Sequence, residues 1–129
     1  MLSFASYNVP IAQAGPRFKA YLERKFACLP VDARRQTIEK WLKIRIWHLA
    51  EKRVWRAFKT LDTSKTEAKR KGDLLKLMMA YRARNKAYGE AIEAHYRATR
   101  HTSSLLRKSW PSDVQDMMIK HPGFFPPRH

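Results

Sequence analysis

The chain has 129 residues and a mass of 15.2 kDa, enough for one domain and too little for a catalytic domain with a regulatory one. Its 27 basic and 11 acidic residues give a formal net charge of +16, yet 44% of the residues are hydrophobic and 12% aromatic, which excludes a disordered basic tail. Four Gly and one Cys exclude glycine-rich phosphate loops, disulfide frameworks and Cys-based zinc sites.

Residues 1–15 are expected to form an extended N-terminal arm. The first 22 residues contain no acidic residue, two serines, several alanines and two basic residues. This composition resembles a weak mitochondrial import signal, although Pro10 and Pro16 break any long helix there. An import signal and a plain extended arm are therefore alternative interpretations of this segment.

A short helix is predicted over residues 16–29. Pro16 suits the first turn of a helix, where its missing N–H group is not needed. Pro30 stops the helix, because the residue before a proline disfavours the helical conformation. Apolar side chains recur at helical spacing inside the segment, at Phe18, Tyr21, Leu22 and Phe26.

A long helix is predicted over residues 32–61, with Asp32 as its N-cap. At about 100° per residue its apolar positions collect on one face, and they are Ile46, Ala50, Val54, Ala57 and Leu61. A basic stripe about 20 Å long is expected on the opposite side, formed by Arg45, Lys52, Arg56 and Lys59, with Arg53 beside it. Trp47, Trp55 and Phe58 widen the apolar face, so this helix is expected to contact neighbours on more than one side.

A second long helix is predicted over residues 64–100, where Ser64 and Glu67 form a capping-box pattern. A basic cluster crowds its first turns, consisting of Lys65, Lys69, Arg70 and Lys71. The apolar positions then recur at a spacing near 3.5 residues, which predicts a helix–helix seam made of Leu74, Leu77, Met78, Tyr81, Tyr88, Ala91, Ile92, His95 and Thr99.

Two long helices joined by a short turn make an antiparallel hairpin. The sequence therefore predicts an all-α fold, a long antiparallel helical hairpin with shorter flanking helices and extended N- and C-terminal arms. Residues 16–110 form the basic helical domain of this prediction, and residues 111–129 form a separate tail.

The tail is predicted to begin with a short helix capped by Ser112 and to end it at His121-Pro122-Gly123. The last residues contain two adjacent phenylalanines and two prolines, a sequence that cannot form a helix. We expect this extended aromatic segment to insert into a groove of a partner protein.

Signals of an enzyme are weak. The acidic pair Glu90 and Glu93 lies at helical spacing and suits ion pairs with Lys86 and Arg97, and Asp113 and Asp116 suit the first turn of a short helix. The five histidines lack the spacing of metal ligands. No catalytic residue, cofactor, metal or small-molecule substrate is predicted.

The basic residues of the two long helices are the predicted contacts to nucleic acid or to anionic lipid. Basic side chains along a helix suit phosphates spaced along a groove, and Arg binds a phosphate through two parallel hydrogen bonds. The predicted set is Arg45, Lys52, Arg53, Arg56, Lys59, Lys65, Lys69, Arg70, Lys71, Arg82, Arg84 and Lys86.

The aromatic residues have two interpretations. Trp41, Trp47, Trp55 and Tyr81 could stack on unpaired bases. At helical spacing, however, aromatic residues more often belong to a core or to a protein interface. The predicted protein-interface set is Trp41, Trp47, Trp55, Phe58, Trp110, Phe124 and Phe125.

These observations favour a non-catalytic structural subunit of a large ribonucleoprotein, an organellar (mitochondrial) ribosomal protein that clamps rRNA with basic helices and contacts neighbouring proteins. The alternative is an accessory subunit of a mitochondrial respiratory complex or ATP synthase, which would contact neighbouring subunits and anionic lipid headgroups. A free DNA-binding module is disfavoured, because no helix-turn-helix pattern is visible.

The expected location is the matrix side of the mitochondrion. No stretch approaches the run of about 18 apolar residues that a membrane-spanning helix requires. A soluble or peripheral protein without a transmembrane helix is therefore expected.

Overall fold

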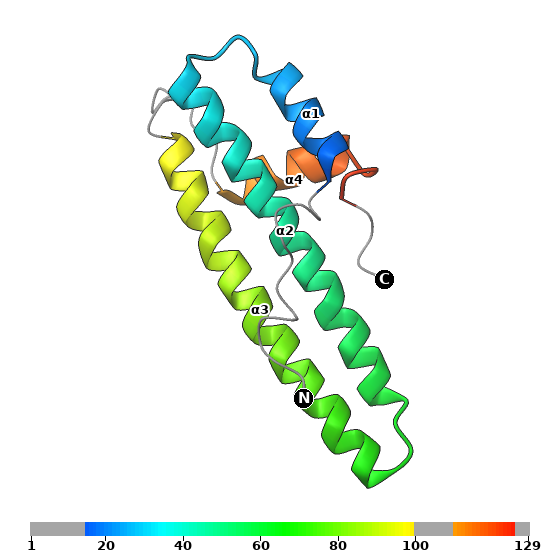
Figure 1. The fold of residues 1–129 in the computed structure, drawn as a ribbon. Helices are drawn as coiled ribbons and strands as arrows, with labels where there is room; N and C mark the ends of the chain where they lie inside the picture. The colour runs from blue at the N-terminus through cyan, green and yellow to red at the C-terminus, as the bar shows by residue number, and fades with distance from the viewer. Residues whose placement is uncertain (1–14, 100–109, 126–129) are drawn as a thin grey trace.

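The computed structural model describes residues 15–99 and 110–125. Its helices follow in chain order as α1 (Pro16–Lys25), α2 (Val31–Asp62), α3 (Glu67–Thr99) and α4 (Trp110–Lys120), and these two ranges contain no strand. The long helices α2 and α3 run antiparallel, while α1 and α4 lie toward the end of the hairpin away from its turn (Figure 1). The predicted all-α hairpin with shorter flanking helices is confirmed. Most of its predicted arms, residues 1–14 of the N-terminal arm and 126–129 of the C-terminal one, lie outside the described residues.

The main core forms where α1 and α4 pack against the two long helices. Phe18, Leu22 and Ile44 are fully buried there, and Val114 and Met117 of α4 join the same cluster. In this region α2 buries side chains on several sides, since seven of the eleven residues from 40 to 50 are buried. This confirms that the helix contacts neighbours on more than one side.

The seam between α2 and α3 differs from the predicted one. The predicted positions Leu74, Met78, Tyr81 and Tyr88 are between 39% and 50% exposed. The residues of α3 that are buried are mostly alanines, namely Ala80, Ala83, Ala87, Ala91, Ala94 and Ala98. Because alanine lets two helix axes approach closely, larger residues of α2 fill the space between the helices. Four of the predicted positions are buried as expected, namely Leu77, Ala91, His95 and Thr99.

Ion pairs join the two long helices along the seam. Lys43 Nζ lies 3.4 Å from Glu90 Oε2, and Arg97 Nη1 lies 3.8 Å from Glu39 Oε1. Arg97 also donates a hydrogen bond to Glu93, as the spacing predicts, whereas Glu90 pairs across the hairpin with Lys43. These partly exposed pairs contribute little to stability, so the apolar seam carries most of it.

The ends of the helices correct three predictions. Helix α1 ends at Lys25 instead of residue 29, and α2 begins at Val31 after Pro30, so Asp32 lies in the first turn and is not the cap. Helix α3 begins at Glu67, where Thr66 Oγ1 accepts a hydrogen bond from Lys69 N at 3.2 Å. Thr66 therefore has the capping role expected of Ser64.

The C-terminal segment, residues 121–125, packs against this chain's own core. The Phe18 ring lies 4.9 Å from the ring of Phe124 and 5.5 Å from that of Phe125, which is 4% exposed. Helix α4, which begins at Trp110 and not at Ser112, brings the segment to this place and ends before His121, as predicted. The expectation that both phenylalanines insert into a partner is wrong for this structure, because α1 and α2 provide the groove.

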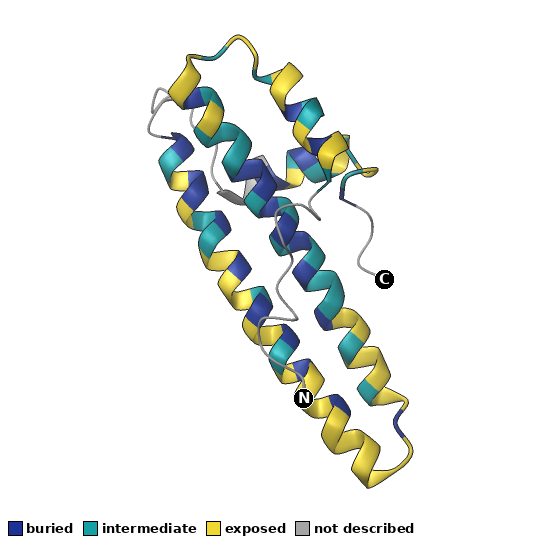
Figure 2. Ribbon diagram, viewed as in Figure 1, coloured by how far each residue is buried: buried dark blue, intermediate teal, exposed yellow. Residues whose placement is uncertain are grey.

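The part of the hairpin near its turn packs more loosely. We call residues 52–86 the distal half and the remaining described residues the proximal half. Most of the distal half is exposed, whereas buried residues concentrate in the proximal half (Figure 2). The buried hydrophobic cluster of the distal half consists of Val54, Leu77 and Ala80, with Ala57 and Leu61 against it.

Candidate nucleic-acid interface

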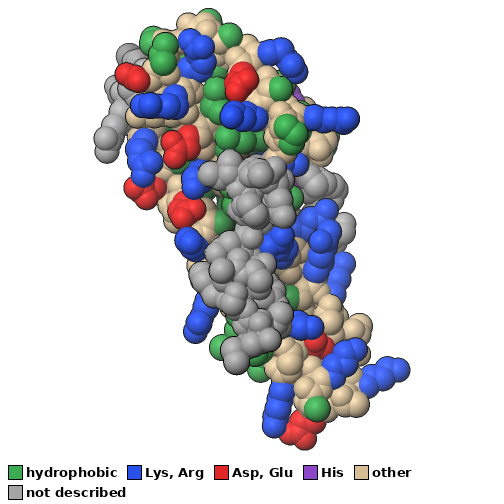
Figure 3. All heavy atoms as spheres, in the orientation of Figure 1, with side chains coloured by type: hydrophobic (Ala, Val, Ile, Leu, Met, Phe, Trp, Pro, Cys, Tyr) green, Lys and Arg blue, Asp and Glu red, His purple; other side chains and the backbone are tan. Residues whose placement is uncertain are grey.

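The distal half concentrates positive charge. It contains twelve basic and three acidic residues. Lys and Arg side chains follow both edges of this half, whereas acidic and basic side chains mix over the proximal half (Figure 3). Both long helices therefore contribute to one cationic region around the turn.

Two of the three acidic residues of the distal half do little to neutralise it, and the third, Asp62, is exposed at the end of α2. Asp73 is 4% exposed and accepts a hydrogen bond from the Ser64 hydroxyl across the turn. Glu67 Oε1 lies 3.7 Å from Lys71 Nζ, and both side chains are exposed to solvent, so the pair is weak. Asp73 thus stabilises the turn without offering a surface carboxylate to the cations around it.

The predicted stripe on α2 is only partly assembled. Arg56 and Lys59 are exposed, and Lys52 and Arg53 are half-buried on the same stretch of helix. Arg45 lies apart from them in the proximal half, where its Nε donates a hydrogen bond to the Phe124 carbonyl at 2.9 Å. Partial burial lowers the pKa of Arg45. The structure therefore gives Arg45 a structural role in holding the C-terminal segment.

The predicted cations of α3 and the turn stay at the surface with one exception. Lys65, Lys69, Arg70, Lys71, Arg82 and Lys86 are all exposed. Arg84 is half-buried, and its Nη1 donates a hydrogen bond to Glu51 Oε1 at 3.2 Å. Arg84 is thus oriented by α2, while the others extend into solvent.

The predicted interface aromatics differ in how far their side chains are buried. Trp41 is 3% exposed and belongs to the core, as does Phe125, so neither offers a surface to a partner in this structure. Trp47 is half-buried, with its ring 5.0 Å from that of Tyr88. Trp55 and Phe58 are 37% and 49% exposed. Phe124 is partly buried in the core, and the side chain of Trp110 lies outside the described part of the chain.

The sequence pattern missed an exposed aliphatic strip on α3. Leu74, Leu75 and Met78 are each about half exposed. They follow the basic cluster closely in sequence, and the exposed Lys76 lies among them, so apolar and cationic side chains lie near one another at the start of α3. The signal that distinguishes the exposed strip from the seam is the run of alanines, which occupies the buried face of the same helix.

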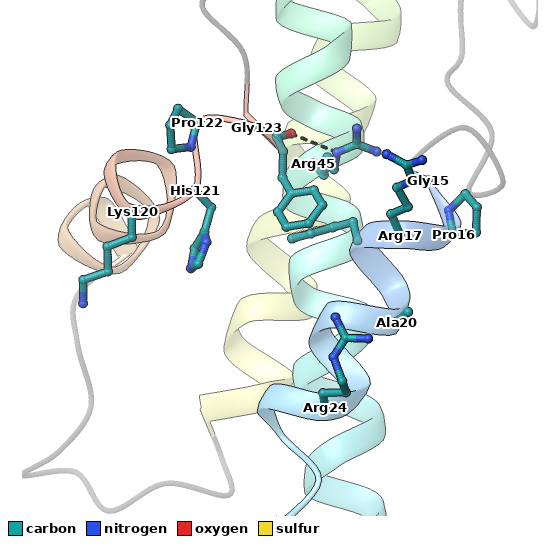
Figure 4. Close-up of a pocket in the computed structure, with 12 residues that line it drawn as sticks. Gly15, Pro16, Arg17, Ala20, Arg24, Arg45, Lys120, His121, Pro122 and Gly123 are labelled. Carbon is teal, nitrogen blue, oxygen red and sulfur yellow. Dashed lines mark hydrogen bonds between the residues drawn. The ribbon is translucent and has the colours of Figure 1, made fainter.

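A second region with cations is a cavity of about 890 Å³ between α1, α2 and residues 120–124 (Figure 4). Arg17, Arg24, Arg45 and Lys120 line it, and no acidic residue of the described chain does. Its apolar wall is formed by Phe18 and Phe124. Such a cavity could hold a small anion, but its cations come from three different elements and Arg45 already binds the Phe124 carbonyl.

We expect acidification to weaken the attachment of the C-terminal segment through His121. Tyr21 Oη and His121 Nε2 lie 2.7 Å apart, and burial, with Lys25 and Lys120 nearby, lowers the pKa of His121 below 6.5. The unfolded chain therefore takes up this proton first, so the free energy of unfolding falls as the pH drops through 6.5. Denaturant titrations at about pH 7.5 and about pH 5 measure the change. The variant His121→Gln should show a smaller fall, and an equal fall would contradict this assignment.

The described residues show neither a metal-binding cluster nor a membrane-spanning helix. No group of three or more His, Cys, Asp or Glu side chains there is arranged to hold a metal ion. None of the described helices has an apolar run long enough to cross a membrane.

Comparison of the chain with protein-family models, with curated proteins and with solved structures found no match. The functional assignment therefore depends on the chemistry of the described residues.

Proposed function

We propose that this chain is a non-catalytic structural subunit of a large ribonucleoprotein and that its distal half clamps RNA. The observation that carries the proposal is the charge of that half. It contains twelve basic and only three acidic residues, and one of the three, Asp73, is buried. The cations of such a surface repel one another, and a bound polyanion relieves this repulsion.

The geometry of the cations suits a phosphate backbone. Exposed Arg and Lys side chains come from both helices and from the turn, so an RNA strand or groove can be contacted from two directions. Each contact to a phosphate releases condensed counterions, which favours binding at moderate salt. The cations that fit this role are Lys52, Arg53, Arg56, Lys59, Lys65, Lys69, Arg70, Lys71, Arg82 and Lys86.

The assembly that we propose is the mitochondrial ribosome, with rRNA and neighbouring ribosomal proteins as the partners. The acid-free N-terminal composition supports import into the organelle. The proximal half supports contact with proteins, because acidic and basic side chains mix over its surface (Figure 3).

Sedimentation of the tagged full chain from a mild-detergent organelle lysate tests the proposal. We expect the chain to migrate with ribosomal particles and to leave the heavy fractions after RNase treatment. Migration with a large membrane complex that is indifferent to RNase would contradict it.

One observation favours a second candidate, an accessory subunit of a mitochondrial respiratory complex or ATP synthase. The aliphatic strip of Leu74, Leu75 and Met78 beside exposed cations resembles a surface that rests on anionic lipid. Flotation of the purified chain with cardiolipin-containing vesicles tests this candidate, which requires binding that Leu75→Asp abolishes.

A further inference from the structure

A smaller cavity of about 400 Å³ opens between α2 and α3 within the cationic region. It is lined by Glu51, Val54, Trp55, Phe58, Tyr81 and Arg84. Its volume lies in the range of about 300–1,000 Å³ that is typical of small-molecule sites. Three aromatic side chains and one pair of opposite charges therefore surround a space that a small planar group can enter.

The three aromatic side chains that line this cavity are partly exposed. The Trp55 and Phe58 rings lie 6.4 Å apart at an interplanar angle of 79°, and both come from α2. Tyr81 lines the cavity from α3 and is 40% exposed. Each of the two helices therefore contributes accessible ring surface to the lining of the cavity.

The polar groups of the cavity are already oriented. Arg84 Nη1 donates to Glu51 Oε1 at 3.2 Å, and Trp47 Nε1 donates to the same oxygen at 3.1 Å. The Arg84 guanidinium also lies 5.2 Å from the centre of the Tyr81 ring. A donor group and an acceptor group thus stand side by side next to the aromatic walls.

We infer that this cavity receives an unpaired base of the bound RNA, an inference that rests on the proposed function. A base offers a flat face for the aromatic rings and an edge of donors and acceptors for Arg84 and Glu51. Lys52 and Arg56 lie within one turn of Trp55, and Arg82 follows Tyr81, so cations are in place for the adjoining phosphates. A lipid acyl chain fits less well, because it would bury the Glu51–Arg84 pair without replacing its contacts to water.

The test uses an RNA hairpin whose strands are joined by a linker without bases, so that its loop offers no unpaired base. It compares this hairpin carrying one unpaired bulge with the same hairpin fully paired. Fluorescence anisotropy gives the Kd of the full chain for each. We expect the bulged hairpin to bind about tenfold more tightly, the size of one base–aromatic stack. Trp55→Ala and Tyr81→Ala should each remove most of this preference and leave the Kd for the paired hairpin unchanged, while Trp55→Phe should retain it.

The matched control is Leu75→Ala, which shortens an exposed apolar side chain of α3 outside the cavity. It should keep the preference for the bulged hairpin. Far-UV circular dichroism of every variant shows whether the helices remain. If Leu75→Ala loses as much as Trp55→Ala, the cavity has no special role and the inference is overturned.

The remaining outcomes separate the inference from the proposed function. Equal affinity of the unaltered chain for the two hairpins overturns the inference and leaves the RNA clamp in place. Binding to neither hairpin overturns the proposed function, and the inference fails with it. Binding to anionic phospholipid vesicles that Trp55→Ala abolishes, without any preference between the hairpins, assigns the aromatic residues to a membrane and overturns the inference.

Discussion

Reversing the charge of four exposed cations in the distal half is expected to weaken RNA binding by about 100-fold or more at moderate salt. The variant combines Arg56→Glu and Lys59→Glu on α2 with Lys69→Glu and Arg70→Glu on α3, all of them exposed residues. Each reversal removes a contact to a phosphate and adds a repulsion. The salt dependence of log K should also become shallower by roughly 3, since about 0.7–0.9 is lost per phosphate contact.

The loss should not come from unfolding. Lys69 and Arg70 lie in the first turns of α3, where glutamate interacts favourably with the helix dipole, so those two changes favour the helix. Anisotropy titrations over a range of salt concentrations give both the affinity for RNA and its salt dependence.

A matched control applies the same charge change to the proximal half. It carries Arg17→Glu, Lys19→Glu, Arg35→Glu and Lys120→Glu, which are also exposed positions. Arg45 is left unchanged in both variants, because it holds the C-terminal segment. Non-specific attraction should make the control bind only a few times more weakly than the unaltered chain. Equal losses in the two variants would show that the distal half is not the clamp.

Replacing Phe18 with alanine is expected to lower the free energy of unfolding by about 3–5 kcal/mol, the usual cost of removing a buried phenylalanine. Phe18 is 0% exposed and joins α1 to Phe124 and Phe125. Its loss leaves a cavity between α1 and the C-terminal segment. Urea unfolding followed by circular dichroism measures the change.

The control for this experiment is Phe58→Ala, because Phe58 is 49% exposed. It should cost about 1 kcal/mol or less, as surface substitutions usually do. If the two variants unfold at the same urea concentration, Phe18 is not central to the packing of α1. A smaller helical signal for Phe18→Ala before any urea is added would show that α1 has already detached.

Periodicity was sufficient to predict the two long helices and the part of the seam at Ala91, His95 and Thr99, but not the part of the seam near the turn. The large apolar residues of α3 indicated a seam through Leu74, Met78 and Tyr81, yet those side chains are exposed. Alanine has too little apolar surface to stand out in a hydrophobicity pattern. Alanine nevertheless determines the seam, because two helices approach closely where small side chains lie between them. The aliphatic strip was missed for the same reason.

The sequence predicted which residues belong to the candidate interface better than it predicted where each of them lies. Most of the predicted cations are exposed in the distal half, since charged side chains on a polar helix face stay in solvent. Arg45 was grouped with them by spacing alone, and spacing along one helix contains no information about Phe124, which lies 79 residues away. The same limit applies to Trp41 and Phe125, whose partners come from distant segments.

The length of the hairpin sets a distance between its two chemically different ends. Helix α2 has 32 residues and α3 has 33, so each extends about 48 Å at 1.5 Å per residue. Because the two helices are paired along the alanine seam, the hairpin resists bending better than a single helix does. A protein bound beside α1 and α4 would therefore be kept tens of ångströms from RNA held at the turn, and the chain would act as a spacer between two layers of an assembly.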